Sequence, residues 1–121
     1  MSETTVDEVW DLVGVWRTVP DVAEQLGIEV TRVRQLIRDG LVLAARPSEG
    51  PLSIPALFIQ DGHVVKGLPG VVTLLRDARY DDVDAIRWLY TADDSLPGTP
   101  VQALVENRGT EVKRRAQALG F

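Results

Sequence analysis

The sequence predicts a mainly α-helical protein in which a short β-hairpin lies between two groups of helices. Apolar residues recur at helical spacing along most of the 121 residues. Glycine and proline divide this pattern into segments of about ten residues, a usual length for globular helices. Residues 41–54 instead contain two short β-type runs joined by a turn. The chain therefore divides into an N-terminal segment, residues 1–17, a middle part, residues 18–66, and a C-terminal part, residues 67–121.

The N-terminal segment is acidic and carries one short amphipathic helix. Its apolar residues follow the spacing of one helix face: Val6, Val9, Trp10 and Val13. Gly14 stands where this helix should end. The stripe is predicted either to join the core or to form a dimer surface.

Two helices of the middle part meet at a glycine. Thr18 is placed as the N-cap of the first helix, and Pro20 suits its first turn. Gly27 ends that helix after Leu26, and only a few residues separate it from the second helix, Val30 to Asp39. The two helices must therefore cross at a steep angle, which is typical of a helix-turn-helix unit.

The second helix and the segment after it complete a winged helix-turn-helix. The inward face of the helix is predicted to hold four apolar side chains: Val30, Val33, Leu36 and Ile37. Gly40 is expected to cap its end. The runs Leu41 to Ala45 and Leu52 to Ile54 then form a β-hairpin around a proline- and glycine-rich turn, at the position of a wing.

The C-terminal part is predicted to form a helical bundle. Four helices are expected, at Pro69 to Ala78, at Asp81 or Asp82 to Tyr90, at Pro100 to Glu106, and at Gly109 to Leu119. The loop Thr91 to Thr99 separates the second of these from the third.

Composition excludes several classes of protein. The chain has 13 basic and 18 acidic side chains and a formal net charge of -5, which argues against a general coat for nucleic acid. It has no cysteine and a single histidine, which excludes disulfides, thiolate zinc sites and metal sites built from two histidines. The N-terminus has no features of a secretory signal, and no apolar run approaches the ~20 residues of a membrane span. We therefore expect a cytoplasmic protein, associated with the nucleoid when it binds DNA.

No group of side chains predicts an enzyme. His63 follows an Asp-Gly turn and has no serine or aspartate grouped with it as a triad requires, so it is expected at the surface. Asp81, Asp82 and Asp84 lack the glycine and glutamate spacing of a calcium loop and are better explained by helix capping. We expect no enzymatic activity, no bound metal and no cofactor.

The helix Val30 to Asp39 carries side chains suited to the DNA major groove. Spacing places four polar residues on its outward face, with a fifth beside them: Thr31, Arg34, Gln35, Arg38 and then Arg32. Arginine pairs with guanine edges or phosphate, glutamine with adenine edges, and threonine with phosphate or a thymine methyl. Residues 30–46 hold four arginines and one acidic residue, although the protein as a whole is acidic. The alternative is that these arginines only solvate a helix face.

Other basic residues are candidates for contacts with the DNA backbone. Arg46, on the wing, can reach a phosphate or the minor groove. Lys66 is a further candidate, with a solvated lysine as the alternative. The basic run Lys113 to Arg115 can bind phosphate, pair with the acidic segment Asp81 to Asp94, or be solvated.

The middle part resembles a known type of DNA-binding module. Its sequence T-V-P-D-V-A-E-Q-L-G, followed by V-T-R-V-R-Q-L-I-R-D-G-L-V, is similar to the winged helix-turn-helix of MerR-like and excisionase-like proteins. The resemblance implies that the helix bearing Thr31, Arg32, Arg34, Gln35 and Arg38 reads DNA and that Arg46 lies on the wing. MerR-type regulators also carry a dimerising coiled coil and an effector domain, which this chain lacks.

Two further resemblances cover the C-terminal part. From about Thr18 onwards the chain is similar to small actinobacterial winged helix-turn-helix proteins with a helical C-terminal domain, through stretches such as V-V-K-G-L-P-G and R-W-L-Y-T-A-D-D-S-L-P-G-T-P. Residues 82–121 also resemble, more weakly, the toxin-binding domain of Xre/MbcA/ParS-type antitoxins, through Trp88-Leu89 and the loop Leu96 to Pro100. This second resemblance implies an alternative function, a module that binds a partner protein through its C-terminal helices.

The sequence therefore predicts a sequence-specific binder of double-stranded DNA that acts as a transcriptional regulator. A homodimer is plausible, because one small module with few basic residues would bind weakly alone. Thr4 and Thr5 are candidates for phosphorylation, since added negative charge near the DNA would weaken attraction to it. The alternative for these two threonines is an ordinary disordered tail.

Overall fold

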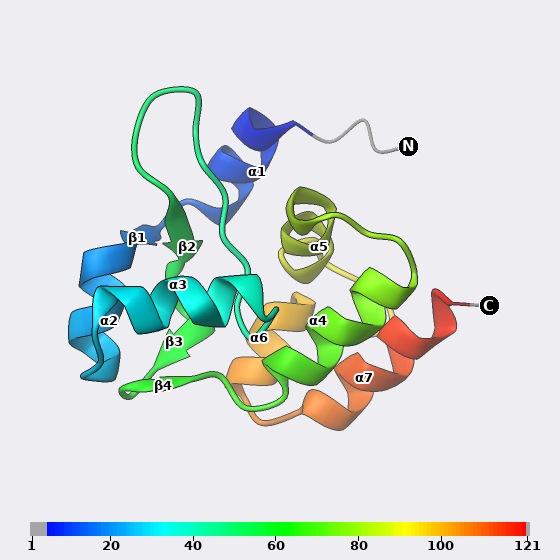
Figure 1. Cartoon of the computed structure of the whole chain (residues 1–121). Helices are drawn as coiled ribbons and strands as arrows, with labels where there is room; N and C mark the ends of the chain where they lie inside the picture. The colour runs from blue at the N-terminus through cyan, green and yellow to red at the C-terminus, as the bar shows by residue number, and fades with distance from the viewer. Residues whose placement is uncertain (1–4, 121) are drawn as a thin grey trace.

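The computed structural model describes residues 5–120 and confirms a mainly helical fold (Figure 1). The helices of this part are α1 (Val6–Val13), α2 (Val19–Leu26), α3 (Val30–Arg38), α4 (Leu68–Asp77), α5 (Asp82–Leu89), α6 (Pro100–Val105) and α7 (Gly109–Ala118). The extended segments are β1 (Trp16–Thr18), β2 (Ser53–Pro55), β3 (Ile59–Gln60) and β4 (His63–Val64), with the 3-10 turn η1 (Ala56–Phe58) before β3. None of the described helices is long and apolar enough to cross a membrane.

Local capping chemistry sets the helix ends. The Thr18 hydroxyl accepts a hydrogen bond from the amide of Asp21 at 3.3 Å, as the predicted N-cap of α2. Asp81 caps α5 in the same way, accepting from the amide of Asp84 at 2.8 Å. Gly27 ends α2 with φ +68°, a left-handed conformation that costs glycine little. These features depend only on near neighbours, so the sequence predicted them correctly.

Two small antiparallel sheets support the helices. In the first, β1 pairs with β2, and Trp16 lies opposite Pro55. In the second, β3 and β4 form a hairpin whose turn is Asp61-Gly62. Both turn residues have positive φ, +51° and +78°, which is the conformation that two-residue hairpins favour.

The wing is a loop rather than the predicted two-stranded hairpin. A single bridge closes it, in which Ala45 and Ser53 exchange two backbone hydrogen bonds of 2.9 Å. Pro47 and Pro51 lie beyond this bridge and have no N–H to donate, so the ladder stops there. Residues 42–45 are buried and, apart from the bridge at Ala45, form no strand.

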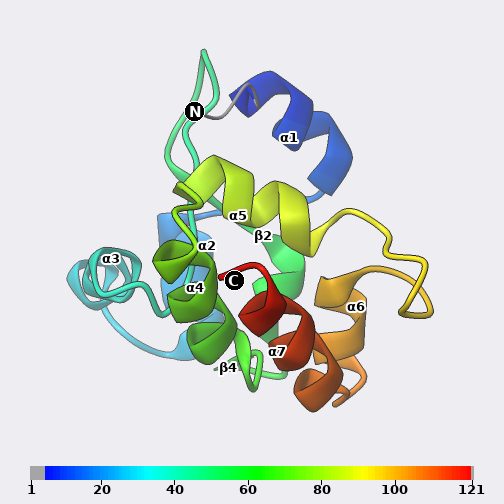
Figure 2. The same ribbon diagram turned by 90° about the vertical axis from the view of Figure 1, so that its right-hand side faces the viewer.

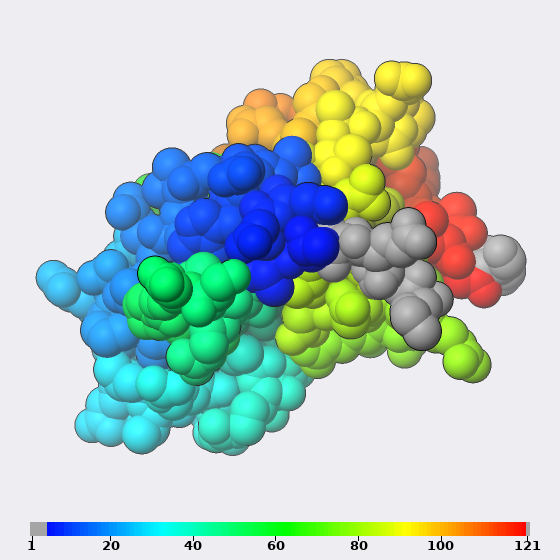
Figure 3. Space-filling view, turned by 90° about the horizontal axis from the view of Figure 1, so that it is seen from above, coloured from blue at the N-terminus to red at the C-terminus, as the bar shows by residue number. Residues whose placement is uncertain are grey.

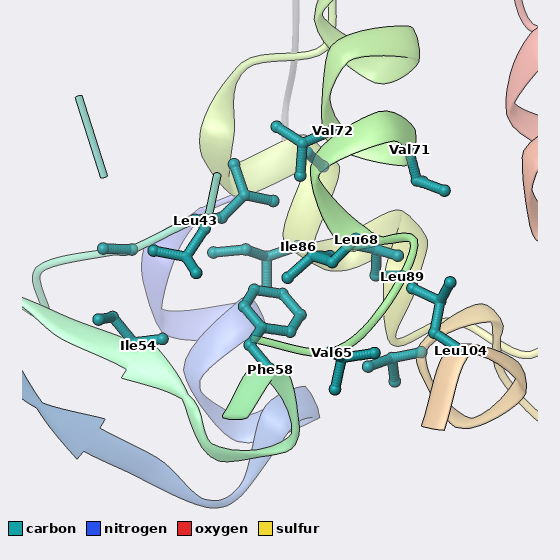
Figure 4. Close-up of a cluster of buried hydrophobic side chains, with 14 of the residues drawn as sticks. Leu43, Ile54, Phe58, Val65, Leu68, Val71, Val72, Ile86, Leu89 and Leu104 are labelled. Atoms are coloured by element: carbon teal, nitrogen blue, oxygen red, sulfur yellow. The ribbon is translucent and has the colours of Figure 1, made fainter. Parts of the chain in front are cut away.

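One hydrophobic core runs through both halves of the chain (Figure 4). Phe58 lies near its centre and is fully buried. The side chains around it come from the winged part and from the C-terminal helices alike, including Leu43, Ile54, Leu68, Ile86 and Leu89. The two halves are therefore joined by shared burial and not only by a connecting segment.

Helix α1 packs against α5 within the same chain. Its Val9 is fully buried, and Val6 and Val13 pack against the core. Trp10 stacks on Trp16, with ring centroids 4.2 Å apart and planes 5° apart. The indole N–H of Trp16 donates to the backbone oxygen of Trp10 at 3.2 Å. The apolar stripe of α1 thus packs on the core of its own chain, through Val9 above all.

Candidate nucleic-acid interface

Helix α3 forms an exposed ridge at the surface of the molecule (Figures 1 and 3). It packs against α2, and Val33 is its fully buried residue. All five side chains predicted to face outward are exposed: Thr31, Arg32, Arg34, Gln35 and Arg38. Within residues 5–120, none of their side chains forms an ion pair or a hydrogen bond. Their polar atoms are therefore available to a partner molecule.

The exposed side chains of α3 are arranged along one face. Thr31, Gln35 and Arg38 follow the i, i+4, i+7 spacing of a single stripe, and Arg34 lies beside them. A shallow hollow of about 510 Å³ runs along this helix, and most of the predicted residues line it: Thr31, Arg32, Gln35 and Arg38, together with Ile28 and Glu29. An α-helix with its side chains is about 10–12 Å across, which suits the roughly 12 Å width of a major groove.

The predicted inward face of α3 is wrong at one position. Val30 is 36% exposed, whereas Leu36 and Ile37 are partly buried against the core. Val30 is the first residue of the helix, so it lies at the end of the packed turn and has neighbours on fewer sides. An apolar side chain therefore stands in the open at the start of α3.

Arg46 lies at the base of the wing, one residue after the bridge at Ala45. Its side chain is exposed. Figure 3 shows the wing beside α3 on the same side of the molecule. The wing tip is held by α1, because the hydroxyl of Ser48 donates to the carboxylate of Asp7 at 3.4 Å.

Lys66 is exposed but belongs to a different surface. It lines a pocket of about 300 Å³ together with Lys113 and residues at the starts of α4 and α7. Figure 2 shows α3 and α7 on opposite sides of α4. The structure thus brings the five residues of α3 together, leaves Arg46 exposed at the base of the wing, and sets Lys66 on a separate surface.

In the basic run Lys113 to Arg115, one arginine is held by the protein and the other two side chains are exposed. Arg115 donates to the backbone oxygen and the hydroxyl of Ser95, both at 2.8 Å. Hydrogen bonds from Ser95 lower the pKa of the Asp93 carboxyl, and the charge of Arg115 lowers it further. Arg115 therefore holds the loop before α6 through Ser95, one residue beyond the acidic segment, and forms no ion pair with it in the described residues. Lys113 and Arg114 remain exposed.

The end of α3 makes a contact with α4 that the sequence did not predict. Asp39 is the C-cap residue, and Gly40 follows it with φ +75° and is buried. The guanidinium of Arg76, on α4, lies where a side chain on Gly40 would stand. Arg76 also pairs with Asp82 at 3.1 Å. No local signal links residues 40 and 76, so this contact was not predictable from spacing.

Of the two candidate phosphorylation sites, only Thr5 lies among the described residues. Thr5 is the N-cap residue of α1, and its hydroxyl accepts a hydrogen bond from the amide of Glu8 at 3.2 Å. Thr4 lies outside the described residues.

Comparison with known proteins connects both halves to one type of protein. Residues 5–59 match the family model described as "DNA-binding protein Rv2175c, wHTH domain". Residues 65–120 match the model described as "Rv2175c C-terminal domain of unknown function". A Mycobacterium tuberculosis protein named "DNA-binding protein Rv2175c" is 40% identical to this chain over 115 residues, covering 85% of this chain and 79% of that protein. The NMR structure of Rv2175c superposes with a TM-score of 0.80 at 39% identity, covering 88% of this chain and 82% of that one.

Proposed function

The chain belongs to the Rv2175c family of winged helix-turn-helix proteins, and we propose that it is a sequence-specific DNA-binding protein that regulates transcription. The observation that carries this proposal is the exposed ridge of α3, with three arginines whose side chains make no ion pair in the described part of the chain. A guanidinium that is already held by a carboxylate would have to lose that partner before binding DNA. The arginines of α3 can bind DNA without first breaking an ion pair.

The residues of α3 divide into two roles. Arg34, Gln35 and Arg38 have donors that fit purine edges in the major groove. Thr31 and Arg32 bind phosphates of the DNA backbone and so hold the helix in register. Arg46 reaches a flanking phosphate from the base of the wing. Lys66 contributes only if the DNA extends beyond α3, because it lies on a separate surface.

The net negative charge of the protein weakens its nonspecific binding to DNA. With a net charge of -5, the molecule is repelled by DNA at long range, so nonspecific binding is weak. Base contacts must then supply much of the free energy of binding. A homodimer on a palindromic site would double those contacts.

The test is a titration of labelled duplex DNA at two salt concentrations. We expect the double variant Arg34→Ala/Arg38→Ala to lose at least tenfold in affinity and to show a shallower dependence on salt. The matched control is Arg79→Ala/Arg87→Ala, which removes two exposed arginines outside α3 and the same charge. Equal losses in the two double variants would remove α3 from the interface.

The remaining features of the proposal follow from the same assignment. The protein acts in the cytoplasm, at the nucleoid, without enzymatic activity and without a cofactor. Residues 18–66 form the DNA-binding domain, and residues 67–121 form a helical domain that supports it. Phosphorylation of Thr4 or Thr5 weakens binding, because a phosphate on Thr5 would add charge at α1, the helix that contacts the wing through Asp7.

A further inference from the structure

The start of α3 carries two exposed side chains that the interface above does not use, Glu29 and Val30. Glu29 is the N-cap residue of α3, but its side chain caps no backbone amide. Its carboxylate makes no hydrogen bond or ion pair with residues 5–120. It nevertheless lines the same hollow as Thr31 and Gln35. A free carboxylate in a phosphate-facing surface is repelled unless it has a donor to bind.

Val30 is unusual among the outward side chains of α3 because it is apolar. It is 36% exposed, although spacing predicted it to be inward. Helical geometry places it one turn before Arg34, at the edge of the polar face. Neither a valine nor a carboxylate can bind phosphate, so neither residue adds to the sequence-independent part of DNA binding.

The position of both residues at the N-terminal end of the helix favours contact with bases. When a recognition helix enters the major groove, residues at its N-terminal end can reach base edges, while neighbours around the helix bind phosphate. Two pyrimidine groups in that groove match the two side chains: thymine presents a C5-methyl, and cytosine presents an N4 amino donor. An apolar side chain fits the first and a carboxylate accepts from the second.

We propose that the start of α3 is a pyrimidine-reading element, in which Val30 packs on the C5-methyl of a thymine and Glu29 accepts a hydrogen bond from the N4 amino group of a cytosine. The proposal rests on the proposed function. It adds that specificity comes from two residues that carry no positive charge. Arg34 and Arg38 supply affinity as well as specificity, whereas Glu29 and Val30 supply specificity alone.

The thymine contact is tested by removing one methyl group from the DNA. The full chain first selects its preferred site from random duplexes. Each thymine of that site is then replaced by deoxyuracil, which lacks the methyl but keeps the base pair. We expect one such replacement to weaken wild-type binding about fourfold and to have no effect on Val30→Ala. Val15→Ala, an exposed valine outside α3, should keep the wild-type response.

The cytosine contact is tested by the preference for cytosine at each position of the site. Glu29→Ala should lose about fivefold of that preference at one position, even if the loss of a negative charge strengthens binding overall. Asp94→Ala, an exposed aspartate in the loop before α6, removes the same charge and should keep the preference.

The outcomes separate this proposal from the one it rests on. If the chain selects no sequence and binds DNA without salt dependence, the proposed function fails and the pyrimidine reading fails with it. If the chain selects a site and Arg34→Ala/Arg38→Ala abolishes binding, the proposed function stands. The thymine contact is then overturned if removing a thymine methyl does not weaken wild-type binding, or if it weakens binding of Val30→Ala as well. The cytosine contact is overturned if Glu29→Ala keeps the wild-type preference for cytosine.

Discussion

At the scale of single residues, exposure and pairing separate the side chains that can bind a partner from those that maintain the fold. Arg34 on α3 and Arg115 on α7 are the same residue type, yet only Arg115 is held, by Ser95. Tyr90 shows the opposite extreme, an ionisable side chain enclosed by the core. It is 8% exposed and packs near Phe58, with ring centroids 6.1 Å apart.

Burial gives Tyr90 a measurable effect on alkaline stability. Desolvation raises the pKa of its phenol well above the ordinary value of 10.0, and the nearby backbone of Leu57 lowers it by less. The folded state therefore keeps the proton when the unfolded state begins to lose it. The contribution to stability is complete below pH 10 and falls as the pH rises above it.

We expect wild-type protein to lose about 1 kcal/mol of unfolding free energy through this group between pH 10 and pH 11. Tyr90→Phe lacks the group and should lose correspondingly less. Urea unfolding at both pH values measures the difference. Tyr80→Phe removes the hydroxyl of the other tyrosine and leaves Tyr90 in place, so it is the matched control. Identical slopes in wild type and Tyr90→Phe would contradict the assignment.

At the scale of elements, the recognition helix is positioned at both of its ends. Gly27 sets the turn that brings α3 across α2, and Gly40 lets the chain leave α3 beneath the guanidinium of Arg76. Both glycines have positive φ, but only Gly40 has a close neighbour. The orientation of α3 therefore depends on a local turn at one end and on a contact with the C-terminal helices at the other.

Substitution of the two glycines separates these effects. Gly27→Ala should cost about 1 kcal/mol, from backbone strain alone, because nothing lies within 4 Å of the added methyl. Gly40→Ala should cost about 1.5–2 kcal/mol, because the methyl must also push aside the flexible end of Arg76 and disturb its exposed pair with Asp82. Urea unfolding gives both values. Equal costs would mean that Arg76 moves aside freely and does not hold the end of α3.

At the scale of the whole molecule, the two halves share one core and are expected to unfold together. Phe58 comes from the winged part, and Ile86 and Leu89 come from the C-terminal helices, yet all three lie in the same buried cluster. This arrangement predicts a single cooperative transition. Tryptophan fluorescence and far-ultraviolet circular dichroism should give the same midpoint.

Removal of the Phe58 ring tests this coupling. Phe58→Ala should lower the unfolding free energy by about 3–5 kcal/mol, from lost burial and the cavity that remains. The transition should stay single, because both halves lose the same support. Leu12→Ala, at a residue that is 45% exposed, should change the free energy by less than about 0.5 kcal/mol. Two separated transitions in wild type or variant would show that the halves fold independently.

Much of the fold was predictable because its signals are local. The caps at Thr18 and Asp81, the turn at Gly27 and the hairpin turn at Asp61-Gly62 depend on residues within a few positions of each other. The exposed face of α3 was predictable as well, because helical spacing alone separates Arg34 and Arg38 from Val33. That these residues contact DNA stays a prediction.

The amino-acid sequence by itself determined where the helices begin and end and which face of α3 is polar, because capping and periodicity act over a few residues. Only the tertiary structure decided that β2 pairs with β1, that Val30 is exposed, that the stripe of α1 packs against α5, and that Arg76 reaches Gly40. Each of these depends on which distant segment packs against the residue. Contacts between segments that are distant in the sequence depend on the whole fold, so the spacing of nearby residues does not predict them.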